Sequence, residues 1–197
     1  MPVNRPLRIP GRRLVLTKNM MIRAQENTNS ASEASRWLDI SYNTYKKPDV
    51  MVAEAKKLLS ICTQEGIEQK KWGGRMHCLR WEHPATLYGW KNAGMTYDST
   101  LGYADHVGFR CGTCFEYPAF DPVADSQLNL RIRPLIAMEV TVIAKRYMGL
   151  GLGQDAYDKF TKIKNACRAV NGSFTLLWHN DSLITKQARE LYSSLLE

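Results

Sequence analysis

The chain contains no apolar run approaching the ~20 residues that a membrane-spanning helix needs. It also lacks the apolar segment and small-residue cleavage site of a secretory signal, although its N-terminus is basic. With 44% hydrophobic and 23% charged residues, the composition is typical of a soluble globular protein. We therefore expect a protein without a membrane span, located in the cytoplasm.

Cysteines are few, and their odd count of five does not suit the disulfide framework of a small secreted domain. Cys111 and Cys114 form CGTC, the spacing of a redox dithiol, and His106 could add a third zinc ligand. However, Glu116 and Pro118 follow where a redox helix should begin, and no second CxxC completes a zinc site. We predict that these cysteines pack a loop and are neither redox-active nor zinc-bound. A thiol-redox or zinc module is nevertheless one of three functional hypotheses, and the other two follow below.

The net charge of +8 is compatible with an anionic partner, but the basic residues are scattered and carry no RNA- or DNA-binding signature. We therefore do not expect nucleic acid as a partner. The GLGLGQ segment lacks the Lys-Ser/Thr of a phosphate-binding loop, so its glycines are interpreted as a turn.

The order of predicted elements indicates an α/β protein. Residues 1–197 are expected to form one domain, with residues 1–12 as a basic N-terminal arm. Apolar spacing and helix-stop signals predict helices over residues 49–66, 84–94, 155–170 and 182–196. Apolar runs predict strands over residues 13–17, 72–81, 95–100, 128–143 and 173–180, with Pro134 marking a bend or a strand edge. This alternation favours an α/β layer or a barrel with parallel strands.

Two segments give weaker signals. The polar stretch from Met20 to Ala34 is interpreted as a loop or a helix N-cap region, with Ser30 or Ser32 capping a short helix through Trp37 and Leu38. Residues 101–127 are rich in glycine and proline and are assigned mostly to loop, with a strand piece at residues 108–110.

Residues capable of chemistry gather between Gly74 and Asp121. This stretch holds three of the four His residues and three of the five Cys residues, together with several Arg and Asp. Such polar groups lie between short apolar runs and glycines, as expected of site loops on a rigid α/β frame. A further histidine, His179, ends the apolar run of the late strand.

Four blocks of this sequence resemble the polysaccharide deacetylases, specifically a divergent branch associated with O-antigen and other surface-polysaccharide clusters. The blocks are GRMHCLRW, YDSTLGYAD, GFRCGTCFEYPAFD and LLWHND, in the expected order between about Leu38 and Ile184. The resemblance implies a distorted or incomplete TIM-like (β/α) barrel. It also implies that a divalent metal (Zn, or Mn, Fe or Co) assists removal of an acetyl group from an N-acetylated sugar or polysaccharide precursor.

The resemblance also assigns roles to residues. His179 matches the late-strand general acid, Asp98 or Asp105 matches the aspartate that partners it, and the segment from Arg75 to Trp81, with Arg80 as its catalytic member, matches the arginine segment. Histidine suits this task because it protonates an amine near neutral pH. The residues that we assign to substrate binding are Arg75, His77, Trp81, Tyr97, Asp105 and Arg110.

The metal side of the family pattern is not recognisable. No Asp precedes Asp39, which stands in WLDISYNTY where the family carries a metal-binding histidine, and no His precedes His77. Asp39 is therefore the one metal ligand that we predict, and a single carboxylate is too few for these metals. The chain is incomplete or degenerate, or it holds the metal through other residues. The alternative function is a catalytically degenerate deacetylase-fold protein that binds a glycan or a partner.

Each assigned residue also has a purely structural interpretation. His179 could be a hydrogen-bonded structural histidine, and Asp98 could be a turn or cap residue. The arginines could pair with buried carboxylates, and Trp81, Trp90 and Tyr97 could belong to the core. We nevertheless expect the ends of the strands at residues 75–80, 95–98 and 174–179 to converge on one cleft.

Overall fold

The computed structural model of the chain describes residues 8–9, 12–13, 20–27, 30–64, 66 and 69–196, with side chains from residue 38 onward. The described residues form one eight-stranded sheet in the order β7-β8-β6-β5-β4-β3-β10-β9, and a separate pair, β1 (Arg8–Ile9) and β2 (Arg12–Arg13). The strands of the large sheet are β3 (Met20–Asn27), β4 (Ser30–Ile40), β5 (Gly73–Met76), β6 (Tyr97–Asp98), β7 (Tyr117–Asp121), β8 (Ser126–Ile132), β9 (Ala137–Met138) and β10 (Ser173–Leu177).

The large sheet mixes parallel and antiparallel pairs. Parallel pairs join β4 to β5, β5 to β6, β6 to β8 and β9 to β10. Antiparallel pairs join β3 to β4, β3 to β10 and β7 to β8. The expected α/β class with a largely parallel sheet is therefore confirmed. Within the described ranges β7 and β9 are edges, so the sheet does not close into a barrel.

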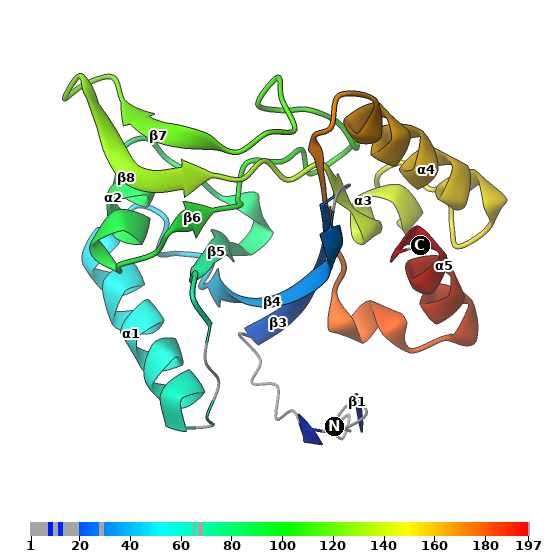
Figure 1. Cartoon of the computed structure of the whole chain (residues 1–197), viewed down its shortest axis with the longest axis horizontal. Helices are drawn as coiled ribbons and strands as arrows, with labels where there is room; N and C mark the ends of the chain where they lie inside the picture. Colours follow the sequence, from blue (N-terminus) through cyan, green and yellow to red (C-terminus); the bar gives the residue numbers. More distant parts are fainter. Residues whose placement is uncertain are drawn as a thin grey trace.

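The helices gather at two ends of the sheet (Figure 1). At one end α1 (Pro48–Gln64) packs on α2 (Ala85–Asn92), as expected for elements that connect β4 to β5 and β5 to β6. At the other end lie α3 (Glu139–Ile143), α4 (Gln154–Ala169) and α5 (Lys186–Leu196). Short 3-10 helices follow β5 at His77–Leu79 and β10 at Asn180–Leu183.

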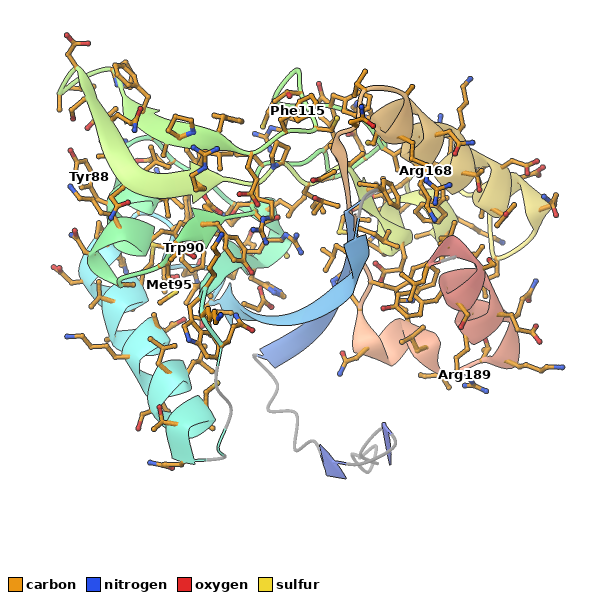
Figure 2. All side chains as sticks on the ribbon, viewed as in Figure 1. Tyr88, Trp90, Met95, Phe115, Arg168 and Arg189 are labelled. Atoms are coloured by element: carbon orange, nitrogen blue, oxygen red, sulfur yellow. The ribbon has the colours of Figure 1, made fainter. Side chains whose placement is uncertain are left out.

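Each group of helices covers its own apolar cluster. The first includes Leu38, Ile40 and Met76 together with Trp90 and Met95, which Figure 2 labels beside α2. The second gathers residues of α4, α5 and β10 around the fully buried Phe160. Burial of these side chains is the main stabilising contribution, at roughly 25 cal/mol per Å² of apolar surface.

The predicted helices were found close to their expected positions because their apolar faces are local patterns. In α1 the buried residues Met51, Ala55, Leu58 and Cys62 follow the helical spacing of the sequence. Helix α4 ends before Asn171 and Gly172, as predicted, and Asn171 adopts a left-handed conformation there. The glycine segment after α3 is a turn, with positive φ at Gly149 and Gly151.

Three segments differ from expectation. The strand predicted over residues 128–143 is wrong at its end, because residues 139–143 form the helix α3 and the strands of that region are β8 and the short β9. Residues 20–40, expected as loop and short helix, form the antiparallel strands β3 and β4, because they add to the sheet between β5 and β10. Residues 108–110 are irregular, and the strand of that region is β7, which pairs with β8. The strand predicted over residues 13–17 lies outside the described residues, except for Arg13 in β2. No helix in the described part of the chain has the length and apolar character to cross a bilayer.

Candidate active site

A pocket of about 290 Å³ opens where the ends of β4, β5 and β10 meet the start of α3. Parallel strands place the residues at their carboxyl ends on one edge of a sheet, which is where α/β proteins build their sites. Its polar lining consists of Asp39, Arg75, His77, Glu139, Arg146, Tyr147, His179, Asp181 and Ser182.

Glu139 is the carboxylate that holds His179. Its Oε1 accepts hydrogen bonds from His179 Nδ1 at 2.5 Å, from the His179 backbone amide at 3.1 Å and from Ser182 Oγ at 3.0 Å. Glu139 is only 1% exposed, because it follows the buried strand β9, which pairs with β10. Its Oε2 is buried and has no hydrogen-bond partner among the described side chains. The expectation that Asp98 or Asp105 partners His179 is therefore wrong.

The environment of His179 favours its protonated form. Burial alone lowers the pKa of an imidazole, but here the hydrogen bond and charge of Glu139, with a contribution from Asp181, outweigh it and raise the pKa. Since Nδ1 donates to the carboxylate, Nε2 is the nitrogen left to meet a ligand.

A second carboxylate–imidazole pair lies in the same pocket. His77 Nδ1 is 3.1 Å from Asp39 Oδ2, and the His77 side chain is half-exposed. Burial raises the pKa of Asp39, although His77, Arg75 and His179 oppose that shift. Both pairs therefore lie close enough to influence one another through their charges.

Arg75 forms part of the wall between these pairs. It lies beside Asp39 in the register of β4 and β5, so both side chains project from the same face of the sheet. Its Nε donates to the Ser99 carbonyl at 2.7 Å and its Nη2 to Ser99 Oγ at 3.1 Å. Burial lowers its pKa to about 10, while Asp39, Asp98 and Glu139 help to keep it charged. Arg75 is therefore a fixed buried cation at neutral pH.

Asp98 does not line the pocket. Its Oδ1 accepts from the Thr100 amide at 2.8 Å and from Thr100 Oγ1 at 2.5 Å, and its Oδ2 accepts from Trp81 Nε1 at 3.0 Å. Burial raises its pKa to about 6 against these hydrogen bonds. This geometry fits the structural interpretation, in which Asp98 is a buried turn residue and Trp81 is its hydrogen-bond donor.

Four more predicted site residues lie outside the pocket lining, namely Arg80, Tyr97, Asp105 and Arg110. Arg80 Nη2 donates to Tyr45 Oη at 2.7 Å, and Tyr97 lies under the Arg133 guanidinium at 3.9 Å. Asp105 is exposed and accepts from His106 at 2.8 Å, and exposed Arg110 donates to the Gly102 carbonyl at 2.9 Å. The strand ends that meet in the pocket are therefore those of β4, β5 and β10, and convergence of the β6 end was wrongly predicted.

The described residues do not fit a metal centre. No group of three or more His, Cys, Asp or Glu side chains among them could hold an ion. Asp39, the predicted ligand, is instead hydrogen-bonded to His77. Zinc and its relatives need three or more ligands with an open position, so the expected metal does not match the donors that these residues offer.

The CGTC thiols lie in packed surroundings. Cys114 is buried in the second apolar cluster, and Cys111 Sγ lies 3.9 Å from the Leu101 carbonyl oxygen. Neither forms a disulfide, and burial raises the pKa of Cys111. A raised pKa disfavours the reactive thiolate.

Comparisons of the chain with protein-family models, with curated proteins and with solved structures found no match. The resemblance to the deacetylases therefore rests on the four sequence blocks.

Sequence analysis missed five polar residues of the pocket lining, namely Glu139, Arg146, Tyr147, Asp181 and Ser182. Two of them, both acidic, follow a strand. Glu139 follows the apolar run LIAM and Asp181 follows LLWHN, so both stand just after a strand. An acidic residue directly after a buried strand is the signal that could have indicated them, because strand ends build α/β sites.

Proposed function

We propose that the chain is a carbohydrate N-deacetylase-like hydrolase that acts on an N-acetylated sugar during bacterial surface-polysaccharide (O-antigen) synthesis in the cytoplasm. Its fold would be an incomplete, distorted TIM-like barrel. The observation that carries this proposal is the His179–Glu139 pair, which lies in the pocket at the end of a late strand. The four sequence blocks support the choice of family.

The chemistry of amide hydrolysis needs an acid at this position. When the C–N bond of an N-acetyl group breaks, the amine leaves only if its nitrogen takes up a proton. His179 would offer that proton from Nε2, and the hydrogen bond and charge of Glu139 raise the pKa of His179, which favours the protonated imidazole. Glu139 thereby acts as a positioning residue for the acid. Arg75 and His77 provide further polar groups in the pocket lining.

A metal in this family activates the water and polarises the carbonyl oxygen. The described residues do not fit such an ion, and we derive no step through one.

The lack of a fitting metal site among the described residues favours a second candidate function, a degenerate deacetylase fold that binds a glycan without cleaving it. Asp39 stands where the resemblance implies a metal-binding histidine, and it pairs with His77 in a hydrogen bond. The acid half of the site would then remain as a polar wall for sugar hydroxyl and amide groups.

Acetate release from β-1,4-linked N-acetylglucosamine oligomers, with and without added Zn²⁺, Mn²⁺ or Co²⁺, tests the proposal. We expect release by the wild type and its loss in Glu139→Gln and His179→Ala. Saccharide binding without acetate release in any metal would establish the second candidate instead. Neither binding nor release would contradict both.

A further inference from the structure

An exposed aromatic ring stands beside the pocket. Tyr42 lies in the turn after β4, and its side chain is 47% exposed. Its ring contacts the His77 ring edge-on, with centroids 6.4 Å apart and planes at 75°. His77 lines the pocket and Tyr42 does not, so the Tyr42 ring lies outside the lining and in contact with one of its residues.

Arg80 holds this ring in place. Its guanidinium carbon lies 4.2 Å from the Tyr42 ring centre and 4.1 Å from that of Tyr45. Its Nη2 donates to Tyr45 Oη at 2.7 Å, and Tyr45 packs against the first apolar cluster. A planar cation between two rings is a stable arrangement. Tyr42 is therefore a rigid surface, and little conformational entropy is lost when a ligand contacts it.

The size of the pocket indicates what should lie on that surface. A volume of about 290 Å³ is at the lower end of the range for small-ligand sites. A chain of sugars with one ring in the pocket must continue outside it. His77 lines the pocket, its side chain is half-exposed, and its ring contacts that of Tyr42. The apolar C–H face of a hexose ring stacks on an aromatic face, and the buried contact replaces water on both surfaces.

We propose that Tyr42 is a stacking platform for a second sugar ring, so that the site takes an oligosaccharide of N-acetylhexosamines rather than a monosaccharide. This inference rests on the proposed glycan ligand but not on catalysis. It also gives Arg80 a positioning role outside the pocket. Phe120, another exposed ring, lies on the edge strand β7 and does not line the pocket.

Calorimetric titration with N-acetylglucosamine and its β-1,4-linked dimer and tetramer tests the platform. The wild type should bind the dimer and tetramer more tightly than the monomer. Tyr42→Ala should lose that gain, roughly three- to tenfold in affinity for the oligomers, while monomer affinity is unchanged. Tyr42→Phe keeps the ring and should retain the gain. Phe120→Ala removes a ring of similar exposure, 49%, four strands away, and should also retain it.

A second measurement does not depend on the folding of any variant. In the wild type, the NMR signals of the Tyr42 ring should shift on addition of the dimer but not of the monomer. A length-dependent gain that survives in Tyr42→Ala, or ring signals that do not move, would overturn the platform and leave the proposed function standing. Loss of the gain without acetate release would support the platform and remove the hydrolase. Failure of the wild type to bind any of these saccharides would overturn both.

Discussion

The His179–Glu139 pair is the contact on which the proposed hydrolysis depends. If His179 is the acid, His179→Ala should lower acetate release by roughly 10²- to 10⁴-fold and leave the unfolding midpoint nearly unchanged. His106→Ala is the matched control, because that histidine is also paired with a carboxylate but is exposed and outside the pocket lining. Destabilisation of His179→Ala with unchanged specific activity would assign a structural role to His179.

The same pair makes a prediction about pH. The folded state raises the pKa of His179 above its ordinary 6.5, so it binds the proton more tightly than the unfolded chain does. The resulting stabilisation is fully present below pH 6.5 and is lost as the pH rises through the folded-state pKa. NMR titration of His179 should therefore give a raised pKa in the wild type and a lower one in Glu139→Gln.

Other charges around His179 set the expected order of effects. Asp181 also raises the pKa of His179, and Arg75 lowers it. Asp181→Asn should therefore lower the pKa by less than Glu139→Gln does. An unchanged pKa in Glu139→Gln would contradict the interpretation of this contact.

Asp98, and otherwise Asp105, was the expected partner of His179, and the structure places the two carboxylates in different surroundings. Asp98→Ala would leave Trp81 Nε1 and two Thr100 donors without their acceptor in a buried site, at a cost of about 1–3 kcal/mol in unfolding free energy. Asp105→Ala, at an exposed position, should leave the unfolding midpoint unchanged. Denaturant unfolding of both variants checks this, and equal midpoints would contradict the structural role of Asp98.

Sequence reasoning at this scale identified His179, Arg75, His77 and Asp39, which do line the pocket. It could not identify the partner of His179, because Glu139 is distant in the sequence and reaches His179 only through the pairing of β9 with β10. It placed Asp98 and Tyr97 at the site because the resemblance matched YDSTLGYAD and because the strand end at residues 95–98 was expected there. Their side chains are instead buried by neighbours that sequence order does not show.

At the scale of elements, the short strand β5 positions Arg75 and depends on its glycines. A Cβ on Gly74 would lie 2.4 Å from the Leu38 carbonyl oxygen and 2.6 Å from a Trp90 ring carbon. Gly74→Ala should therefore cost about 1–3 kcal/mol, the usual range for overpacking. Gly153, at the start of α4, has no atom within 4 Å of such a Cβ, so Gly153→Ala is the control and should have a much smaller effect. Unfolding midpoints compare the two, and equal shifts would contradict the tight packing of β5.

Helices were predictable because each carries its apolar spacing within a few turns. The β3–β4 hairpin was not, because the sequence from Gln25 to Ser32 is polar and contains residues that favour turns. Its strand structure comes from pairing with β5 and β10, which are distant in sequence. Tertiary pairing has overridden local preference in this segment.

At the scale of the whole molecule, the described residues give no reason for a tightly held metal. Chelator treatment of the purified protein should therefore leave its unfolding midpoint unchanged, and metal analysis should find no stoichiometric ion. A fall in the midpoint on chelation, restored by Zn²⁺ or Mn²⁺, would show that other parts of the chain complete a site. It would also strengthen the hydrolase over the glycan-binding alternative.

The β3–β4 hairpin sets the distance between the two halves of the pocket. One of its strands pairs with β10, which leads to His179, and the other pairs with β5 and carries Asp39. The distance between His179 and Asp39 is therefore set by the number of residues that separate the β3–β10 pairing from the β4–β5 pairing. One added or deleted residue in β4 before Asp39 would reverse which face of the sheet Asp39 occupies. Because Leu38 and Ile40 of the first apolar cluster lie on the same strand, such a change would also turn their side chains off the core face, so the length of this hairpin fixes the pocket and the core together.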